Sequence, residues 1–286
     1  MAFRIVADSS ANVLSLPGVN YATVPMKIVA HKEYIDDPKL DVAAMVADLQ
    51  AHKGKSGSSC PNVADWLDAF GEESEIFGLT ITKYLSGSYN SAQQAAQIYM
   101  QEHPGRKVFI IDSLSTGPAM MMIVEKLLQC EQNGDDFETA KAKALDYANH
   151  NHTLFCLESM MNLARNGRTS MAVAKIASII GIRVVGDVKG GQITPVHKPR
   201  GAKGATGTLL EMIKERGFQD GNTLRIAHCF GETAANALRE AVLAEFPNAR
   251  FILEPTTALC SFYAEEGGLI IGFEGRLNAQ NDNRIY

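Results

Sequence analysis

The sequence lacks the short motifs that identify common catalytic centres. It contains no G-x-G-x-x-G of a dinucleotide-binding turn, no G-x-S-x-G nucleophile elbow and no H-E-x-x-H zinc motif. Gly54-Lys55-Ser56 matches the end of a Walker A loop, but Leu49 stands where its first glycine belongs. The seven histidines do not cluster at the spacing of a recognisable catalytic base. These absences argue against an enzyme that acts by itself.

Cysteine, long apolar runs and excess positive charge are also scarce. The five cysteines include no C-x-x-C pair, so we expect no metal site and no redox dithiol. The chain begins in a strand pattern without a signal-peptide core, and no apolar run approaches the roughly 20 residues needed to cross a bilayer. A net charge of -5 argues against a nucleic-acid partner. We therefore expect a cytoplasmic protein without a cofactor.

Length and hydrophobic patterning predict two domains of different class. The 286 residues, 46% hydrophobic and 21% charged, suit a two-domain globular protein. Residues 1–152 alternate strands and helices, which predicts an α/β/α sandwich around a mostly parallel sheet. Residues 153–286 contain a hairpin signal, 183–187 and 192–197 joined by Lys189-Gly190-Gly191, which predicts an α+β domain with a mixed or antiparallel sheet. Helices are expected near 160–165 and 169–180, and a polar surface tail after Arg276.

Small hydroxyl residues follow three predicted strands of the first half. They are Ser9-Ser10, Ser86-Gly87-Ser88 and Ser113-Leu114-Ser115. Because ligands of open α/β sheets bind beyond the carboxyl ends of the strands, these residues predict a polar pocket. The second of these segments also precedes a predicted helix at 91–101, whose first N–H groups attract anions. The alternative is that Ser88 or Asn90 simply caps that helix.

A further glycine- and serine-rich segment, 53–61, is predicted to be a loop. Pro61 is expected to be the first residue of the helix that follows it.

Several motifs, in order along the chain, resemble the landmarks of the DegV family. They are Asp8-Ser9-Ser10, Ser58-Ser59-Cys60-Pro61, Leu85-Ser86-Gly87-Ser88-Tyr89-Asn90-Ser91-Ala92, Ile111-Asp112-Ser113 and Leu163-Ala164-Arg165-Asn166-Gly167-Arg168-Thr169-Ser170. The resemblance implies a two-domain protein that binds a long-chain fatty acid between its domains. Some members are the acyl-binding subunit of bacterial fatty acid kinase, where a separate subunit supplies ATP and phosphorylates the carboxylate.

The resemblance also implies roles for individual residues. Ser58 matches a family threonine whose hydroxyl meets the fatty-acid carboxylate, and Ser86 with the backbone of Gly87 matches a second set of donors. Tyr263 aligns where the family has a histidine near the carboxylate. Arg168 and Arg200 match positions that contact the kinase partner.

The chain departs from the family pattern in two segments. Glu265 and Glu266 beside Tyr263 could disfavour an anionic head group, and Gly201 and Gly204 thin the basic segment around Arg200. Fatty-acid binding tolerates these changes better than the kinase partnership does. A transient contact with a membrane surface is also expected.

A fatty-acid tail needs a long apolar tunnel. We expect Met120, Met121, Ile176 and Ile179 to line it, because methionine adapts to irregular shapes. The alternative is that these side chains are ordinary core. Two other functions stay open from the residues alone: a small-molecule hydrolase or transferase with Ser86 or Ser88 as nucleophile, and a phosphate-binding regulatory domain.

Overall fold

The first half of the chain is built around a parallel four-stranded sheet. The computed structural model describes residues 3–277. Sheet A has the order β2-β1-β6-β7, and each pair of neighbours is parallel. Its strands are β1 (Arg4–Asp8), β2 (Tyr21–Val24), β6 (Glu75–Thr80) and β7 (Lys107–Asp112). Most of their apolar residues are buried, as expected for a sheet with two covered faces.

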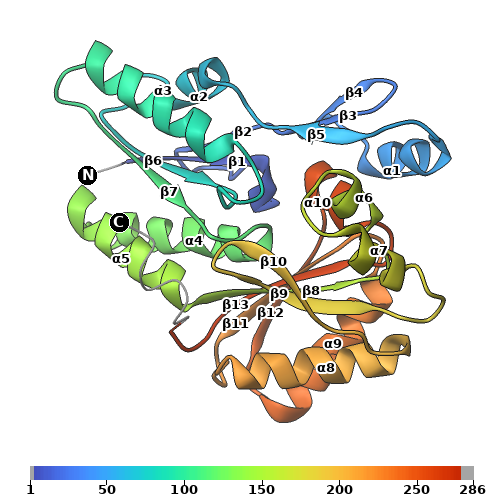
Figure 1. Ribbon diagram of the computed structural model, residues 1–286. Coiled ribbons are helices and arrows are strands. Elements are labelled where there is room, and N and C mark those ends of the chain that lie inside the picture. The colour runs from blue at the N-terminus through green and yellow to red at the C-terminus, as the bar shows by residue number, and fades with distance from the viewer. Residues whose placement is uncertain (1–2, 278–286) are drawn as a thin grey trace.

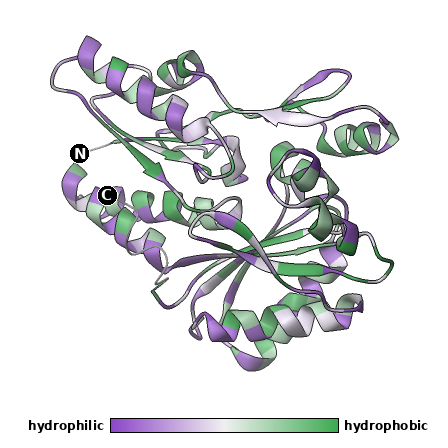
Figure 2. Ribbon diagram, in the orientation of Figure 1, coloured by the Kyte–Doolittle hydropathy of each residue, from purple (hydrophilic) through white to green (hydrophobic). Residues whose placement is uncertain are grey.

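Helices cover both faces of sheet A (Figure 1). One face packs against α2 (Val63–Phe70) and α3 (Ser88–Glu102), around the fully buried Trp66 and Phe70. The other packs against α4 (Pro118–Gln132) and α5 (Phe137–His150). Figure 2 shows hydrophilic and hydrophobic residues alternating along α3, as a helix with one solvent face requires. The predicted α/β/α sandwich is confirmed.

A small antiparallel sheet extends from this sandwich and carries one wall of the cavity described below. Sheet B has the order β4-β3-β5, formed by β3 (Lys27–Val29), β4 (Glu33–Ile35) and β5 (Gly57–Ser59). Helix α1 (Val42–Ala51) connects β4 to β5. The loop predicted for 53–61 is therefore wrong over β5, because pairing with β3 orders residues whose composition is typical of a loop.

The second half contains a six-stranded mixed sheet. Sheet C has the order β10-β9-β8-β13-β11-β12, in which only β11 and β12 are parallel neighbours. Its strands are β8 (Asn151–Leu157), β9 (Val184–Lys189), β10 (Gln192–His197), β11 (Thr223–His228), β12 (Arg250–Pro255) and β13 (Leu269–Glu274). Helices α8 (Gly201–Glu215) and α9 (Glu232–Glu245) cover one face. The predicted hairpin and the mixed sheet are confirmed.

The opposite face of sheet C carries the elements that join the two halves. Helix α4 packs closely over β13 and also contacts sheet A. Helices α6 (Met161–Arg165), α7 (Met171–Ala177) and α10 (Ala258–Ala264) lie beyond it, near α1 and sheet B (Figure 1). The predicted division between residues 152 and 153 stays a prediction, and it lies within β8.

Several predicted boundaries are wrong. Pro61 precedes α2, because Asn62 is the N-cap and forms a capping box with Asp65. Helix α3 begins three residues earlier than expected, and α7 ends at Ala177 rather than at residue 180. The tail predicted after Arg276 lies outside the described residues except for Leu277. No helix within residues 3–277 is long and apolar enough to cross a membrane.

The packing of α4 on β13 depends on Gly272. A Cβ at this position would lie 2.4 Å from the backbone nitrogen of Ala119, in the first turn of α4. Replacing Gly272 by alanine should therefore lower the free energy of unfolding by about 1–3 kcal/mol, measured by chemical denaturation. Gly207→Ala is the matched control: it lies on the exposed side of α8 with nothing within 4 Å, and should raise stability by about 0.5–1 kcal/mol. Equal effects of the two substitutions would contradict this close helix-sheet contact.

Candidate functional site

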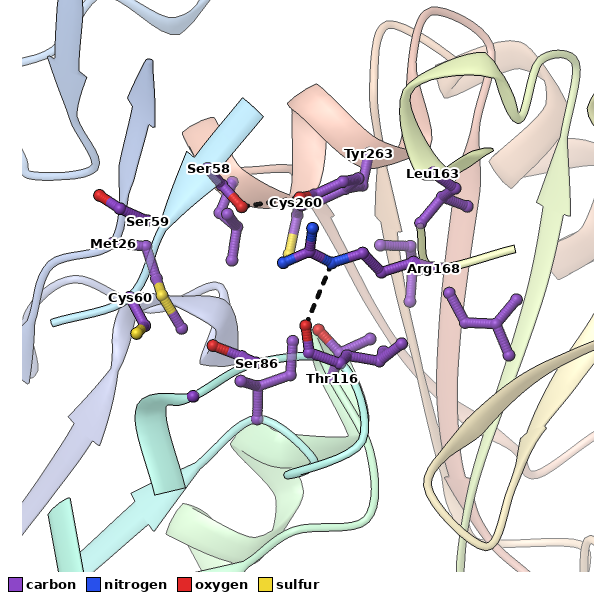
Figure 3. A pocket seen from close by; sticks show the side chains of 16 residues that line it. Met26, Ser58, Ser59, Cys60, Ser86, Thr116, Leu163, Arg168, Cys260 and Tyr263 are labelled. Atoms are coloured by element: carbon purple, nitrogen blue, oxygen red, sulfur yellow. Dashed lines mark hydrogen bonds between the residues drawn. The ribbon is translucent and has the colours of Figure 1, made fainter. Parts of the chain in front are cut away.

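A cavity of about 280 Å³ lies where sheet A, sheet B, α10 and sheet C meet. Most of its wall is apolar, and hydroxyl groups and one guanidinium interrupt it (Figure 3). The lining residues are Met26, Ser58, Ser59, Cys60, Ile81, Leu85, Ser86, Gly87, Thr116, Leu163, Arg168, Ile193, Leu259, Cys260, Tyr263 and Ile270. An apolar cavity with a few polar groups at one place is typical of a ligand site.

Two residues predicted from the resemblance meet across the cavity. The hydroxyls of Ser58 on β5 and Tyr263 on α10 lie 2.7 Å apart, and either can be the donor. These residues are 205 positions apart in the sequence. The pairing leaves both hydroxyls at the cavity surface, where each could turn to a ligand.

The turn before α3 supplies a second group of donors. Gly87 is the N-cap of α3, and the hydroxyl of Ser86 accepts a hydrogen bond from the backbone N–H of Ser88 at 3.2 Å. Neither Ser88 nor Asn90 caps the helix, because no side chain makes a capping bond there. A Cβ at position 87 would lie 3.2 Å from the sulfur of Cys60, so glycine fits this close approach. Ser86 and Gly87 both line the cavity, and their binding of a carboxylate stays a prediction.

Arg168 points into the cavity and is the charged residue among those that line it (Figure 3). Its Nη1 donates to the carbonyl oxygen of Asn166 at 2.6 Å, and its Nε donates to that of Leu85 at 3.2 Å. The guanidinium carbon lies 5.7 Å from the centre of the Tyr263 ring. The sequence placed this arginine toward a protein partner, but the structure places it beside the hydroxyl pair.

The other residues predicted for the site lie elsewhere. Arg200 is the exposed N-cap of α8 and does not line the cavity. Glu265 and Glu266, expected near the head group, line a separate cavity of about 320 Å³. The carboxylate of Glu265 accepts from the backbone N–H of Asn162, and that of Glu266 accepts from the side chain of Gln50.

The tunnel residues predicted from the sequence do not line this cavity. Met120 and Met121 are buried in the core between α4 and sheet A, so the alternative, ordinary core, describes them. Ile176 lies on α7, and Ile179, after the end of that helix, is 50% exposed. The apolar wall consists instead of residues that sequence patterns could not separate from core: Met26, Ile81, Leu85, Leu163, Ile193, Leu259 and Ile270.

Helix α10, which sequence reasoning missed, is held in place by a side chain from the first half. Both oxygens of Asp36 accept backbone N–H groups at the start of this helix, from Ala258 at 2.8 Å and from Leu259 at 3.1 Å. Asp36 is almost completely buried, and burial raises the pKa of its carboxyl while these hydrogen bonds lower it. The aspartate therefore fixes the helix that brings Tyr263 to the cavity.

Of the serines at the three strand ends, only Ser86 lines the cavity, and the others are buried. Asp8, Ser9, Ser10 and Ser88 are fully buried, and the hydroxyl of Ser88 donates to Asp8 at 2.7 Å. The backbone N–H of Ile81 donates to the same carboxylate oxygen at 3.0 Å. The pocket predicted from three strand ends is thus wrong for these serines, whose hydroxyls turn inward.

The arrangement suits an amphiphilic anion. Arg168 and the nearby hydroxyls can hold a negatively charged head group, and the apolar wall can hold a chain. No histidine is among the lining residues, so the cavity gives its serines no imidazole base, and the geometry favours binding over serine catalysis. Within residues 3–277, no three His, Cys, Asp or Glu side chains group as a metal site would require.

The comparisons with known proteins match almost the whole chain. The sequence profile described as "Uncharacterised protein, DegV family" matches residues 2–275. A DegV domain-containing protein of Streptococcus pneumoniae is 36% identical over 280 residues, which cover 96% of this chain and 99% of that protein.

Two solved structures are similar over the same extent. A DegV family protein from Eubacterium eligens, loaded with heptadecanoic acid, has a TM-score of 0.93 and 38% identity. The S. pneumoniae Fatty Acid Kinase (Fak) B3 protein, loaded with linoleic acid, has a TM-score of 0.93 and 36% identity. Each comparison covers 96% of this chain and 100% of the other.

The buried carboxyl of Asp8 should make stability depend on pH. Burial raises the pKa of Asp8 from 3.8 to about 6, against the hydrogen bonds it accepts. Between these two values the folded state holds a proton that the unfolded state releases, so stability falls as pH rises through this window. The shift corresponds to on the order of 3 kcal/mol.

Burial also raises the pKa values of Asp36 and Asp112. The variant Asp8→Asn removes the titration of Asp8 alone, so comparison with the wild type separates its contribution from theirs. The free energies of unfolding of the wild type and of Asp8→Asn are measured by denaturation from pH 4 to pH 7. As pH rises, the wild type should become less stable relative to Asp8→Asn. A difference that stays constant over this range would contradict the assignment.

Proposed function

The chain belongs to the DegV family, and we propose that it binds a long-chain fatty acid in the cavity described above, without catalysing a reaction by itself. The observation that carries this proposal is the cavity itself: one arginine and several hydroxyls lie at one place in an otherwise apolar wall. Relatives that share the fold at 36–38% identity hold fatty acids. The site and the relatives support the same class of ligand.

The apolar part of such a ligand would supply most of the binding energy. Burying a chain of about fourteen methylenes is worth up to about 11 kcal/mol, at ~0.8 kcal/mol each, before the cost of ordering the chain. Leu163, Leu259 and Ile270 are among the side chains that would contact it. This energy suffices for tight binding without any chemical step.

The carboxylate would determine the orientation. A buried carboxylate costs several kcal/mol unless it accepts hydrogen bonds. We assign Ser58, Tyr263, Ser86 and the backbone of Gly87 as its donors, with Arg168 supplying positive charge. The two hydroxyls that now bond to each other would each have to turn toward the ligand.

We further propose that the bound acid is presented to a separate fatty acid kinase subunit in the cytoplasm. The similarity to the Fak B3 protein supports this role. Arg200 remains the proposed partner contact, because it is exposed at the start of α8 and Lys203 lies in the first turn of that helix. Arg168, being inside the cavity, would act on the partner's reaction only through the head group. Contact with a membrane surface remains a further proposal.

Native mass spectrometry of the protein as purified tests the proposed ligand directly. We expect a bound mass that matches a fatty acid and leaves on denaturation, which would also give its chain length. A protein that is purified without ligand and takes up neither palmitate nor oleate would contradict the proposed function.

Ser86→Ala tests the proposed head-group site. It should weaken fatty-acid binding by about 1–3 kcal/mol, because the buried carboxylate loses a donor. The measurement is calorimetric titration with oleate. Ser74→Ala is the matched control. Ser74 is exposed and directly precedes β6, whereas Ser86 lies after that strand. The Ser74→Ala variant should therefore bind oleate as the wild type does. Unchanged affinity in Ser86→Ala would contradict the assigned donors.

A further inference from the structure

Three fully buried residues, Asp8-Ser9-Ser10, lie behind the cavity without lining it. They end β1 and begin a short 3-10 helix, Ser9–Ala11. A buried polar group must find a partner, so the bonds of this segment show which parts of the fold it holds. Beyond local bonds and one contact from Ser10 to Met120, these bonds reach four segments that form the cavity wall.

The side chain of Asp8 holds the turn that carries the first donors. One carboxylate oxygen accepts from the hydroxyl of Ser88 at 2.7 Å and from the backbone N–H of Ile81 at 3.0 Å. Ile81 lines the cavity, and Ser88 directly follows Ser86 and Gly87. The position of those two residues therefore depends on the carboxylate behind them.

The hydroxyl of Ser9 holds the two elements that carry the hydroxyl pair. It accepts from the backbone N–H of Met26 at 3.0 Å, directly before β3, which pairs Ile28 with Ser58. Met26 also accepts the backbone N–H of Asp36 at 2.9 Å, and the carboxyl oxygens of Asp36 accept the first N–H groups of α10. Through Met26, sheet B with Ser58 and α10 with Tyr263 are thus both connected to the hydroxyl of Ser9.

The backbone carbonyl of Ser10 holds the remaining segments. It accepts from the N–H of Gly117 at 2.7 Å, next to the lining residue Thr116. The thiol of Cys260, another lining residue on α10, donates to the same oxygen at 3.7 Å.

We propose that Asp8-Ser9-Ser10, with Asp36, is the positioning element of the head-group site, setting the distance between its two groups of donors. The proposal rests on the proposed function. The position of the first group, Ser86 and Gly87, depends on the hydrogen bonds of Asp8. The position of the second group, Ser58 and Tyr263, depends on those of Ser9 and Asp36. A carboxylate needs donors from both groups at once, because each oxygen accepts in its own direction. The apolar tail has no such requirement and tolerates small displacements of the wall.

This difference between head and tail supplies a test that a loss of general stability would not reproduce. Calorimetric titration with oleate and with methyl oleate measures the preference for the free acid over an ester with the same tail. Ser9→Ala and Ser88→Ala each remove one hydroxyl from the network and leave the lining residues unchanged. We expect each to weaken oleate binding about tenfold while methyl oleate changes less than about twofold, so the preference for the acid falls.

Ser113→Ala is the matched control. Ser113 is also buried and directly follows β7 of the same sheet, but its hydroxyl bonds only within the turn to Ser115. It should lose stability, measured by thermal unfolding, and keep the preference for the acid. If Ser9→Ala does not fold, Ser88→Ala carries the test alone.

The outcomes separate the two proposals. A wild-type protein that binds neither ligand would overturn the proposed function, and this inference with it. A wild-type protein that prefers oleate, with variants in which both ligands weaken by the same factor, would overturn the positioning role alone. A reduced preference in the two network variants but not in Ser113→Ala would support it.

Discussion

The architecture around the cavity depends on the need of two buried carboxyl groups for hydrogen-bond donors. Asp8 and Asp36 are almost fully withdrawn from water, and burial raises the pKa of both. Each finds its donors in segments that are distant in the sequence: Ile81 and Ser88 for Asp8, and Ala258 and Leu259 for Asp36. Because an unsatisfied buried carboxylate is costly, these bonds fix the relative position of α3, α10 and sheet A. The interior thus uses polar groups to set geometry where apolar packing alone would permit sliding.

That geometry explains how a cavity persists at the meeting of three sheets. Helix α4 contacts both sheet A and sheet C, and Gly272 allows its backbone to lie close against β13. Leu259 and Tyr263 of α10 and Ser58 of sheet B are among the residues that form the cavity wall. The polar groups come from four different segments: β5 for Ser58, the turn before α3 for Ser86, the segment between α6 and α7 for Arg168, and the last turn of α10 for Tyr263. In the proposed function, hydrogen bonds hold the head group of the ligand, whereas dispersion and burial hold its chain.

Much of the fold was predictable because the spacing of apolar residues along the chain indicates its strands and helices. Alternating strands and helices in the first half and the Lys189-Gly190-Gly191 turn in the second depend on neighbouring residues alone. Prediction from the sequence failed for β5 and α10 because the partners of these elements are distant in the sequence. β5 reads as a loop by composition, and only its register with β3 makes it a strand that presents Ser58. Helix α10 has no side-chain cap of its own, and Asp36, more than 200 residues earlier, caps it.

The sequence by itself determined the class of each half, the family and the polar residues that reach the cavity, Ser58, Ser86, Gly87 and Tyr263. Small polar residues between periodic apolar segments can be recognised without a structure, and the order of the motifs along the chain indicates the family. Only the tertiary structure decided that Arg168 turns inward and that Met120 and Met121 are core rather than wall. Core and cavity lining share one apolar composition. They differ in whether a partner from a distant segment fills the space beside them, and that is decided when the sheets pack together.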